Sequence, residues 1–208
     1  MIVAGHRDGY RLTFDEAGYQ ELQHAGARVG MKFRLSSGRY QLRMVLCDLA
    51  DGKISTRNEP LEVIPLSEDL PYISSLVLHT ATVTAIDRAD TDDDYNPLRL
   101  GKETIVPSLA RSYPREGFLG VYFHVYNVSE QESQPYQYRL NLYRDEVLAT
   151  KSDPHAVQSK NRHPLKGYVF SWRLSLSDLA AGEYRVEAEV SLPDGSNRVS
   201  RSASFRID

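Results

Sequence analysis

Apolar residues recur at every second position in many segments of this chain, which is the pattern of β-strands that bury one face. The clearest segment is Phe118–Val128, whose inward row is Leu119, Val121, Phe123 and Val125. A second row, predicted to be part of a core, is Tyr40, Leu42, Met44 and Leu46. Strands are predicted at Tyr10–Phe14, Met31–Leu35, Tyr40–Leu46, Ile54–Ile64, Ile73–Ile86, Phe118–Val128, Tyr136–Tyr143, Glu146–Lys151, Tyr168–Leu176, Tyr184–Leu192 and Arg198–Ile207.

One phrase occurs twice. Leu35-Ser-Ser-Gly38-Arg-Tyr40 is echoed, 144 residues later, by Leu179-Ala-Ala-Gly182-Glu-Tyr184. In each copy a Leu-x-x-Gly-x-Tyr turn leads into an alternating strand, and an Asp-Gly pair follows further along the chain. Two copies of one hairpin phrase predict two β-sandwich modules in tandem.

The predicted fold class is therefore all-β, with two tandem immunoglobulin-like β-sandwich modules. Residues 1–66 are expected to form a short, partial module with one short helix near residues 15–25, where Thr13 or Asp15 offers an N-cap. Residues 67–72 are the linker, within a proline-rich stretch. Residues 73–208 are expected to form a complete sandwich, interrupted by a long polar insertion at 87–117 that carries no predicted strand.

Composition and charge limit the classes of function. The chain has 208 residues, of which 41% are hydrophobic and 25% charged, as in ordinary globular proteins. Its formal net charge of -3 and its scattered Lys and Arg residues give no basic patch for nucleic acid or for an anionic membrane. The apolar runs are too short to span a bilayer. Residues 1–20 lack the charged start and apolar stretch of a secretory signal.

Several segments resemble a known family. The run Gly38-Arg-Tyr40-Gln-Leu42-Arg-Met44-Val45, followed by Gly52-Lys53 and Leu61-Glu62-Val63-Ile64-Pro65, resembles the C-terminal β-sandwich region of bacterial VWFA-related domain proteins. The likeness spans roughly residues 30–208 and continues in the family's order through Asn96-Pro97-Leu98-Arg99, Phe123-His124-Val125-Tyr126-Asn127, Tyr143-Arg144-Asp145 and Gly182-Glu-Tyr184. It implies an extracytoplasmic, non-catalytic region of a larger adhesion-like protein. The Asp-x-Ser-x-Ser metal segment of a von Willebrand A domain is absent from the sequence, so metal-dependent adhesion is not implied.

The repeated phrase also resembles the tyrosine corner of immunoglobulin-like and fibronectin type III domains. That likeness implies that the hydroxyls of Tyr40 and Tyr184 bond back to the backbone of the preceding turn.

The candidate binding residues are Tyr122, His124 and Tyr126, on the polar face of the Phe118–Val128 strand. Three rings on an open sheet face would form an aromatic stripe suited to a sugar or to a partner protein. The alternative is that the 87–117 segment or the first module covers this face, so that the rings are structural.

Other chemistry-bearing residues form no catalytic pattern. The acidic run between Asp87 and Asp94 departs from an EF-hand, because Tyr95 replaces the turn glycine and Gly101 the bidentate glutamate, so a solvated loop is favoured over a calcium site. The six histidines lack metal-ligand spacing. The single cysteine, Cys47, is expected to be inert. We therefore expect no enzyme activity, no cofactor and no metal.

The expected function is a non-catalytic binding or spacer module of a bacterial extracytoplasmic protein. Because the first module is short of strands, it is expected to leave an open sheet edge that binds a protein partner or a second copy of the chain. The alternative is a carbohydrate-binding accessory sandwich that uses the aromatic face. No nucleic-acid partner and no membrane insertion are expected.

Overall fold

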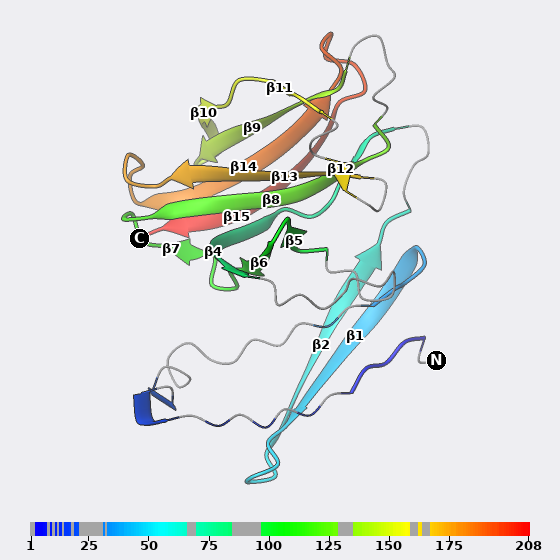
Figure 1. Ribbon diagram of the computed structural model, residues 1–208, viewed down its shortest axis with the longest axis vertical. Helices are drawn as coiled ribbons and strands as arrows, with labels where there is room; N and C mark the ends of the chain where they lie inside the picture. Colours follow the sequence, from blue (N-terminus) through cyan, green and yellow to red (C-terminus); the bar gives the residue numbers. More distant parts are fainter. Residues whose placement is uncertain are drawn as a thin grey trace. The chain divides into compact units, whose positions relative to one another are not determined.

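The computed structural model is nearly all β and divides into two compact units, Met1–Pro65 and Leu66–Asp208 (Figure 1). The boundary falls beside the proline-rich stretch expected to be a linker. The structure describes residues 3–7, 9, 11, 13, 15–17, 19–20, 31, 33–65, 70–84, 97–128, 135–158, 162–163 and 167–208. Within these ranges, only the backbone is described for residues 81–84 and 162–163.

The described residues of unit 2 form two sheets. The first has the strand order β10-β9-β14-β15-β7, with β11 beside β9, and every pairing in it is antiparallel except β15 with β7. Its strands are β7 (Ser112–Tyr113), β9 (Gln137–Arg144), β10 (Val147–Lys151), β11 (His155–Ala156), β14 (Gly182–Ser191) and β15 (Val199–Ile207).

The second sheet has the order β12-β13-β8-β4-β6-β5, with β3 beside β8, and is antiparallel throughout. Its strands are β3 (Tyr72–Ile73), β4 (Val77–Thr84), β5 (Arg99–Leu100), β6 (Glu103–Pro107), β8 (Phe118–Tyr126), β12 (Arg162–His163) and β13 (Gly167–Ser175).

The core of unit 2 lies between these sheets. One cluster of buried residues joins the inward row of β8 to the inward row of β14, which comprises Tyr184, Val186, Ala188 and Val190. Alternation therefore predicted the inward row of β8 correctly, because that strand has one face toward the other sheet. The predicted all-β sandwich fold is confirmed in this unit.

The prediction that residues 87–117 form an insertion without strands was partly wrong. Within 97–117 the chain forms β5, β6 and β7, and β6 pairs with β4 and buries Ile105. Short polar strands of this kind lack a strong alternating pattern, since their pairing is decided by the neighbouring strand. Residues 85–96, which include the acidic run, lie outside the described residues.

Unit 1 contains a single hairpin among its described residues. β1 (Gly38–Cys47) pairs antiparallel with β2 (Ile54–Val63) across a turn that contains the Asp51-Gly52 pair. Residues 16, 17, 19 and 20 are helical, so the start of the expected short helix is present, and 21–25 lie outside the described residues. The expected strand at Met31–Leu35 is not formed by residues 31 and 33–35, nor is that at Tyr10–Phe14 by residues 11 and 13.

The predicted core row of unit 1 is not buried. Tyr40 and Leu42 are half-buried, whereas 41% of Met44 and 72% of Leu46 is exposed. The prediction was wrong because alternation shows only which side chains share a face. Burial also needs a second layer, and the described residues of unit 1 supply none.

Both copies of the repeated phrase adopt the corner that the resemblance implied. The Tyr40 hydroxyl donates to the Ser36 carbonyl at 2.7 Å, and the Tyr184 hydroxyl donates to the Ala180 carbonyl at 2.8 Å. The glycine two residues before each tyrosine has a positive φ, +154° at Gly38 and +147° at Gly182, a conformation that other residues rarely adopt. The glycine and the tyrosine are therefore required together.

Candidate functional site

The predicted aromatic stripe is not an open surface. Tyr122 is 1% exposed and His124 4% exposed, whereas Tyr126 is half-buried. The expectation of an exposed stripe was wrong for the first two residues. The alternative, in which the 87–117 segment covers this face, is found for its described part. Residues 97–100 pack against Tyr122 and bond to Tyr122 and His124.

Hydrogen bonds hold the covering segment in place. The Tyr122 hydroxyl lies 2.9 Å from the Pro97 carbonyl, 3.2 Å from the Arg99 carbonyl and 2.9 Å from His124 Nε2. His124 Nε2 is also 2.9 Å from the Pro97 carbonyl. A buried polar side chain needs such partners. These two residues therefore act as a clamp between β8 and the segment that leads into β5.

Tyr126 lies at the edge of the clamp. Its ring is stacked on His124 at 5.7 Å and tilted against Tyr72 at 6.3 Å, centroid to centroid. A Cβ atom added at Gly167, on the paired strand β13, would meet the Tyr126 ring at 2.8 Å. Burial raises the pKa of the Tyr126 hydroxyl above its ordinary value, and the nearby Tyr72 hydroxyl raises it further.

This shift predicts a loss of stability in alkali. A free tyrosine has a pKa of about 10. Since the pKa of Tyr126 is higher in the folded protein, the unfolded chain releases this proton first. Below about pH 10 the hydroxyl is protonated in both states and its ionisation does not affect stability. Above that value the free energy of unfolding falls as the pH rises. We expect Tyr126→Phe to flatten the decline of Tm between about pH 9 and 11. A decline identical to that of the parent chain would contradict this.

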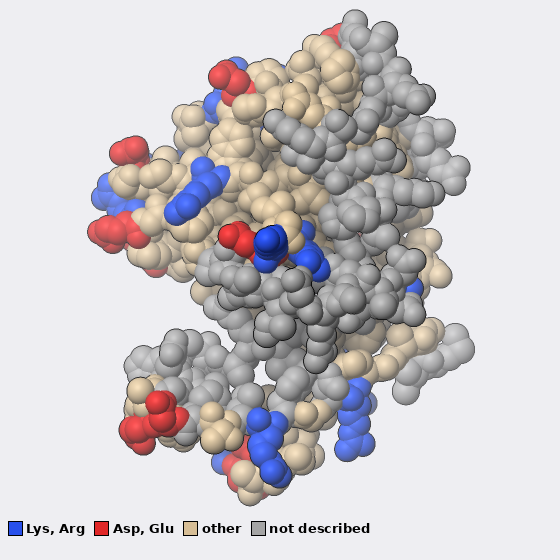
Figure 2. All heavy atoms as spheres, viewed as in Figure 1, with Lys and Arg blue, Asp and Glu red and all other residues tan. Residues whose placement is uncertain are grey.

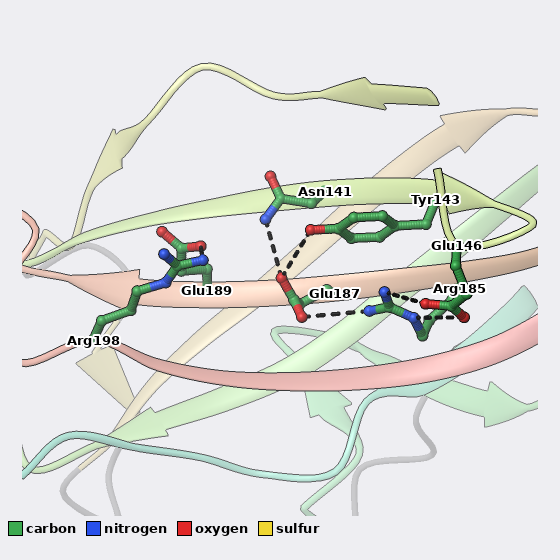
Figure 3. Close-up of polar contacts among 7 residues, drawn as sticks. All are labelled: Asn141, Tyr143, Glu146, Arg185, Glu187, Glu189 and Arg198. Carbon is green, nitrogen blue, oxygen red and sulfur yellow. Dashed lines mark hydrogen bonds and ion pairs between the residues drawn. The ribbon is translucent and has the colours of Figure 1, made fainter. Parts of the chain in front are cut away.

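A second polar cluster lies on the outer face of the β9–β14–β15 sheet (Figure 3). Glu187 Oε1 accepts hydrogen bonds from Asn141 at 3.2 Å and Tyr143 at 3.3 Å, and its Oε2 accepts one from Arg185 at 3.4 Å. Arg185 also donates to Glu146 at 2.9 Å, which raises the pKa of the guanidinium. The guanidinium carbon lies 4.1 Å from the centre of the Tyr143 ring.

The other half of this cluster is a carboxylate between two arginines. Glu189, whose side chain is 9% exposed, lies 2.6 Å from Arg198 and 3.9 Å from Arg139. Three arginines and three glutamates thus balance in charge within this cluster. Carboxylates that are already paired with arginine are poor general bases. This arrangement therefore holds three strands together. The sequence did not predict it, because alternating charges on a strand are equally typical of a solvated face without a network.

Two further features of unit 2 concern its space for ligands and its groups for metals. A cavity of about 120 Å³ lies between the sheets, lined by Val121, Leu140, Trp172, Val186 and Lys151 among others. Pockets for small-molecule ligands begin at about 300 Å³. Among the described residues, no three His, Cys, Asp or Glu side chains gather closely enough to hold a metal ion.

The described charges are also mixed. On the face drawn in Figure 2, Lys and Arg side chains lie among Asp and Glu side chains rather than forming a patch of one sign. In the part of the chain that the structure describes, no helix has both the length and the apolar character needed to cross a membrane.

The β1–β2 hairpin exposes several large apolar side chains. The face that carries Tyr40, called its inner face below, presents Met44 and Leu46, together with Leu61, which is 38% exposed. On the opposite face Val45 is 59% exposed. Cys47 is exposed.

Comparisons with known proteins assign this chain to no family. No protein-family model matches it, and no curated protein is similar to it. Among solved structures, one similar chain is the PmoD soluble domain from Methylocystis sp. ATCC 49242 (Rockwell). It is 11% identical, covers 69% of this chain and 95% of its own, and has a TM-score of 0.33. A likeness of that size supports no inference about the site.

Proposed function

We propose that this protein is a non-catalytic interaction module that binds a protein partner through the exposed β1–β2 sheet of unit 1. The observation that carries the proposal is the exposure of Met44 and Leu46 on a sheet that has only two strands among the described residues. Hairpins of two strands are marginally stable in water on their own. Clustered, exposed apolar side chains on a folded protein are typical of an interaction site. Here Arg57 and Glu59 lie beside them on the same face.

The polar chemistry of unit 2 supports the same interpretation. The buried clamp at Tyr122 and His124 holds chain segments together, and the carboxylates of Glu187 and Glu189 are engaged by arginines. These groups stabilise strands, so unit 2 is suited to be a stable carrier. A sugar site on the aromatic face has no such support, because two of its three rings are buried.

The proposal includes a location outside the cytoplasm, in a bacterial protein. It is supported only by the resemblance of residues 30–208 to VWFA-related proteins.

An apolar dye tests the exposed face directly. We expect 8-anilinonaphthalene-1-sulfonate to fluoresce with the full chain, and the variant Met44→Gln with Leu46→Gln to lower that fluorescence by roughly threefold, because both side chains stand on the apolar face. The matched control is Val45→Gln, an exposed residue on the opposite face of the same strand. Fluorescence that is absent, or that falls equally in the control, would contradict the proposal.

A further inference from the structure

The hairpin β1–β2 repeats the register of β14–β15, the last hairpin of unit 2. Gly38 pairs with Val63 in the first, and the residues 144 positions later, Gly182 and Ile207, pair in the second. The same offset holds along the hairpin as far as Leu46 with Ser55 and Val190 with Val199. Together with the two tyrosine corners, this means that one local structure occurs twice in the chain.

The two copies differ in what covers them. In unit 2 the inner face of the hairpin is buried against the second sheet, with Tyr184 at 4% exposure and Val190 at 0%. The equivalent residues of unit 1 are the half-buried Tyr40 and the exposed Leu46. On the neighbouring strand, the buried Phe205 and Ile207 correspond to Leu61 and Val63. A face that forms a core in unit 2 is thus uncovered by any described sheet in unit 1.

An arginine occupies the same position in both hairpins. Arg201 lies on β15 and reaches the other sheet, where its Nε is 3.4 Å from the Ile73 carbonyl and its guanidinium carbon is 5.4 Å from the centre of the Tyr72 ring. Its equivalent on β2 is Arg57, which forms an ion pair with Glu59 inside the hairpin. Arg57 therefore stands where a side chain that contacts a covering sheet would stand.

The outer edge of the hairpin differs as well. In unit 2 the second edge of β14 pairs with β9, with Tyr184 opposite Arg144. Among the described strands, β1 pairs with β2 alone. No described strand thus occupies its second edge.

We propose that β1–β2 is the closing hairpin of a second sandwich, and that the occupant of its apolar face is the apolar side of a β-sheet from a partner polypeptide. That sheet would cover Tyr40, Leu42, Met44, Leu61 and Val63 as the β8 sheet covers β14–β15, and its backbone carbonyls and aromatic rings would meet Arg57. This inference rests on the proposed function and specifies the chemistry of its partner. A second strand beside β1 would complete the layer.

An in-register graft tests whether this face fits such a sheet. Residues 35–63 replace 179–207 in the full chain, so that the first hairpin must pack against the β8 sheet. A second graft keeps Ala188 and Ala203, because Met44 and Glu59 would otherwise be forced in at those positions. The chain has one tryptophan, Trp172, which packs against the core of unit 2, so its emission reports the sandwich. We expect at least one graft to keep a cooperative thermal transition at a lower Tm.

The matched control is a graft of residues 36–64, shifted by one position. It has nearly the same composition, but the shift turns every side chain to the other face, so that Gln41 and Arg43 point into the core. We expect the transition to be lost in this control. If both in-register grafts also lose it, or if the shifted graft keeps it, the inference is overturned.

Light scattering of the full chain separates this inference from the proposed function. We expect no dimer that depends on the inner face. A dimer that dissociates with Met44→Gln but not with Val45→Gln would assign the face to a second copy of the chain. That result would overturn the partner inferred here while leaving the interaction role of the face intact.

Discussion

Replacing Gly120 by alanine is expected to destabilise unit 2 by about 3 kcal/mol, at the upper end of the cost of overpacking a core. Gly120 on β8 lies opposite His79 on β4, and His79 is 4% exposed. A Cβ atom at Gly120 would come within 2.5 Å of the imidazole Cδ2 and closer still to Nε2 and Cε1. The ring has no solvent side toward which to move. Urea unfolding followed by Trp172 emission measures the loss.

The control for this prediction is Gly117→Ala, one residue before β8. An added Cβ there meets no atom within 4 Å, so little change is expected. Combining Gly120→Ala with His79→Ala should cost less than the sum of the two single changes, because the second change removes the clash. If Gly120→Ala unfolds at the same urea concentration as Gly117→Ala, the His79 ring does not fill this space.

The fate of the aromatic stripe shows where sequence patterns stop. Alternation placed Tyr122 and His124 on the face opposite Phe123, and that placement is right. Whether the face is wet depends on residues 97–107, which pair or pack there from a distance in the chain. A strand covered on both sides by separate segments keeps polar residues on one side, since those residues can bond to the covering backbone. The pattern of such a strand is the same as that of a half-exposed one.

The hairpin of unit 1 shows the same limit in reverse. The rows that begin at Tyr40 and Tyr184 have equivalent patterns, and the turn, the glycine and the tyrosine corner were all predictable from them. One row is nevertheless a core, whereas the other runs from half-buried at Tyr40 to exposed at Leu46. The difference lies in the layer above the row, which local sequence does not encode. The equivalence of Arg57 and Arg201, which follow the same offset of 144 residues, is present in the sequence. A closer comparison of the two copies would have found it.

The polar cluster around Glu187 was not predicted for a different reason. Its members come from three separated segments, and only the β9–β14 pairing brings Asn141 and Glu187 opposite each other. Charges at alternate positions of a strand are also found on faces with no network. The identity of the partners therefore depends on register, which follows from the core residues on the other face.

Truncating Phe123 to alanine is expected to remove about 3–5 kcal/mol of stability, the usual cost for a buried phenylalanine. Phe123 is 0% exposed, and its ring is stacked on Phe170 at 5.4 Å and meets Tyr138 edge-on at 6.3 Å. It therefore joins strands of both sheets, β8 and β13 on one side and β9 on the other. Since a domain is typically stable by about 5–15 kcal/mol, this loss is a large share of the total.

Phe118 provides the comparison on the same strand. It is half-buried, and the Arg173 guanidinium carbon lies 3.5 Å from its ring centre. Phe118→Ala should cost only about 1 kcal/mol, because an exposed cation–π contact contributes little and the site can be filled by water. Urea unfolding of both variants, monitored by Trp172 emission, measures the difference. Equal losses at the two positions would mean that Phe123 is not the link between the layers, and the sandwich core as described would then be wrong.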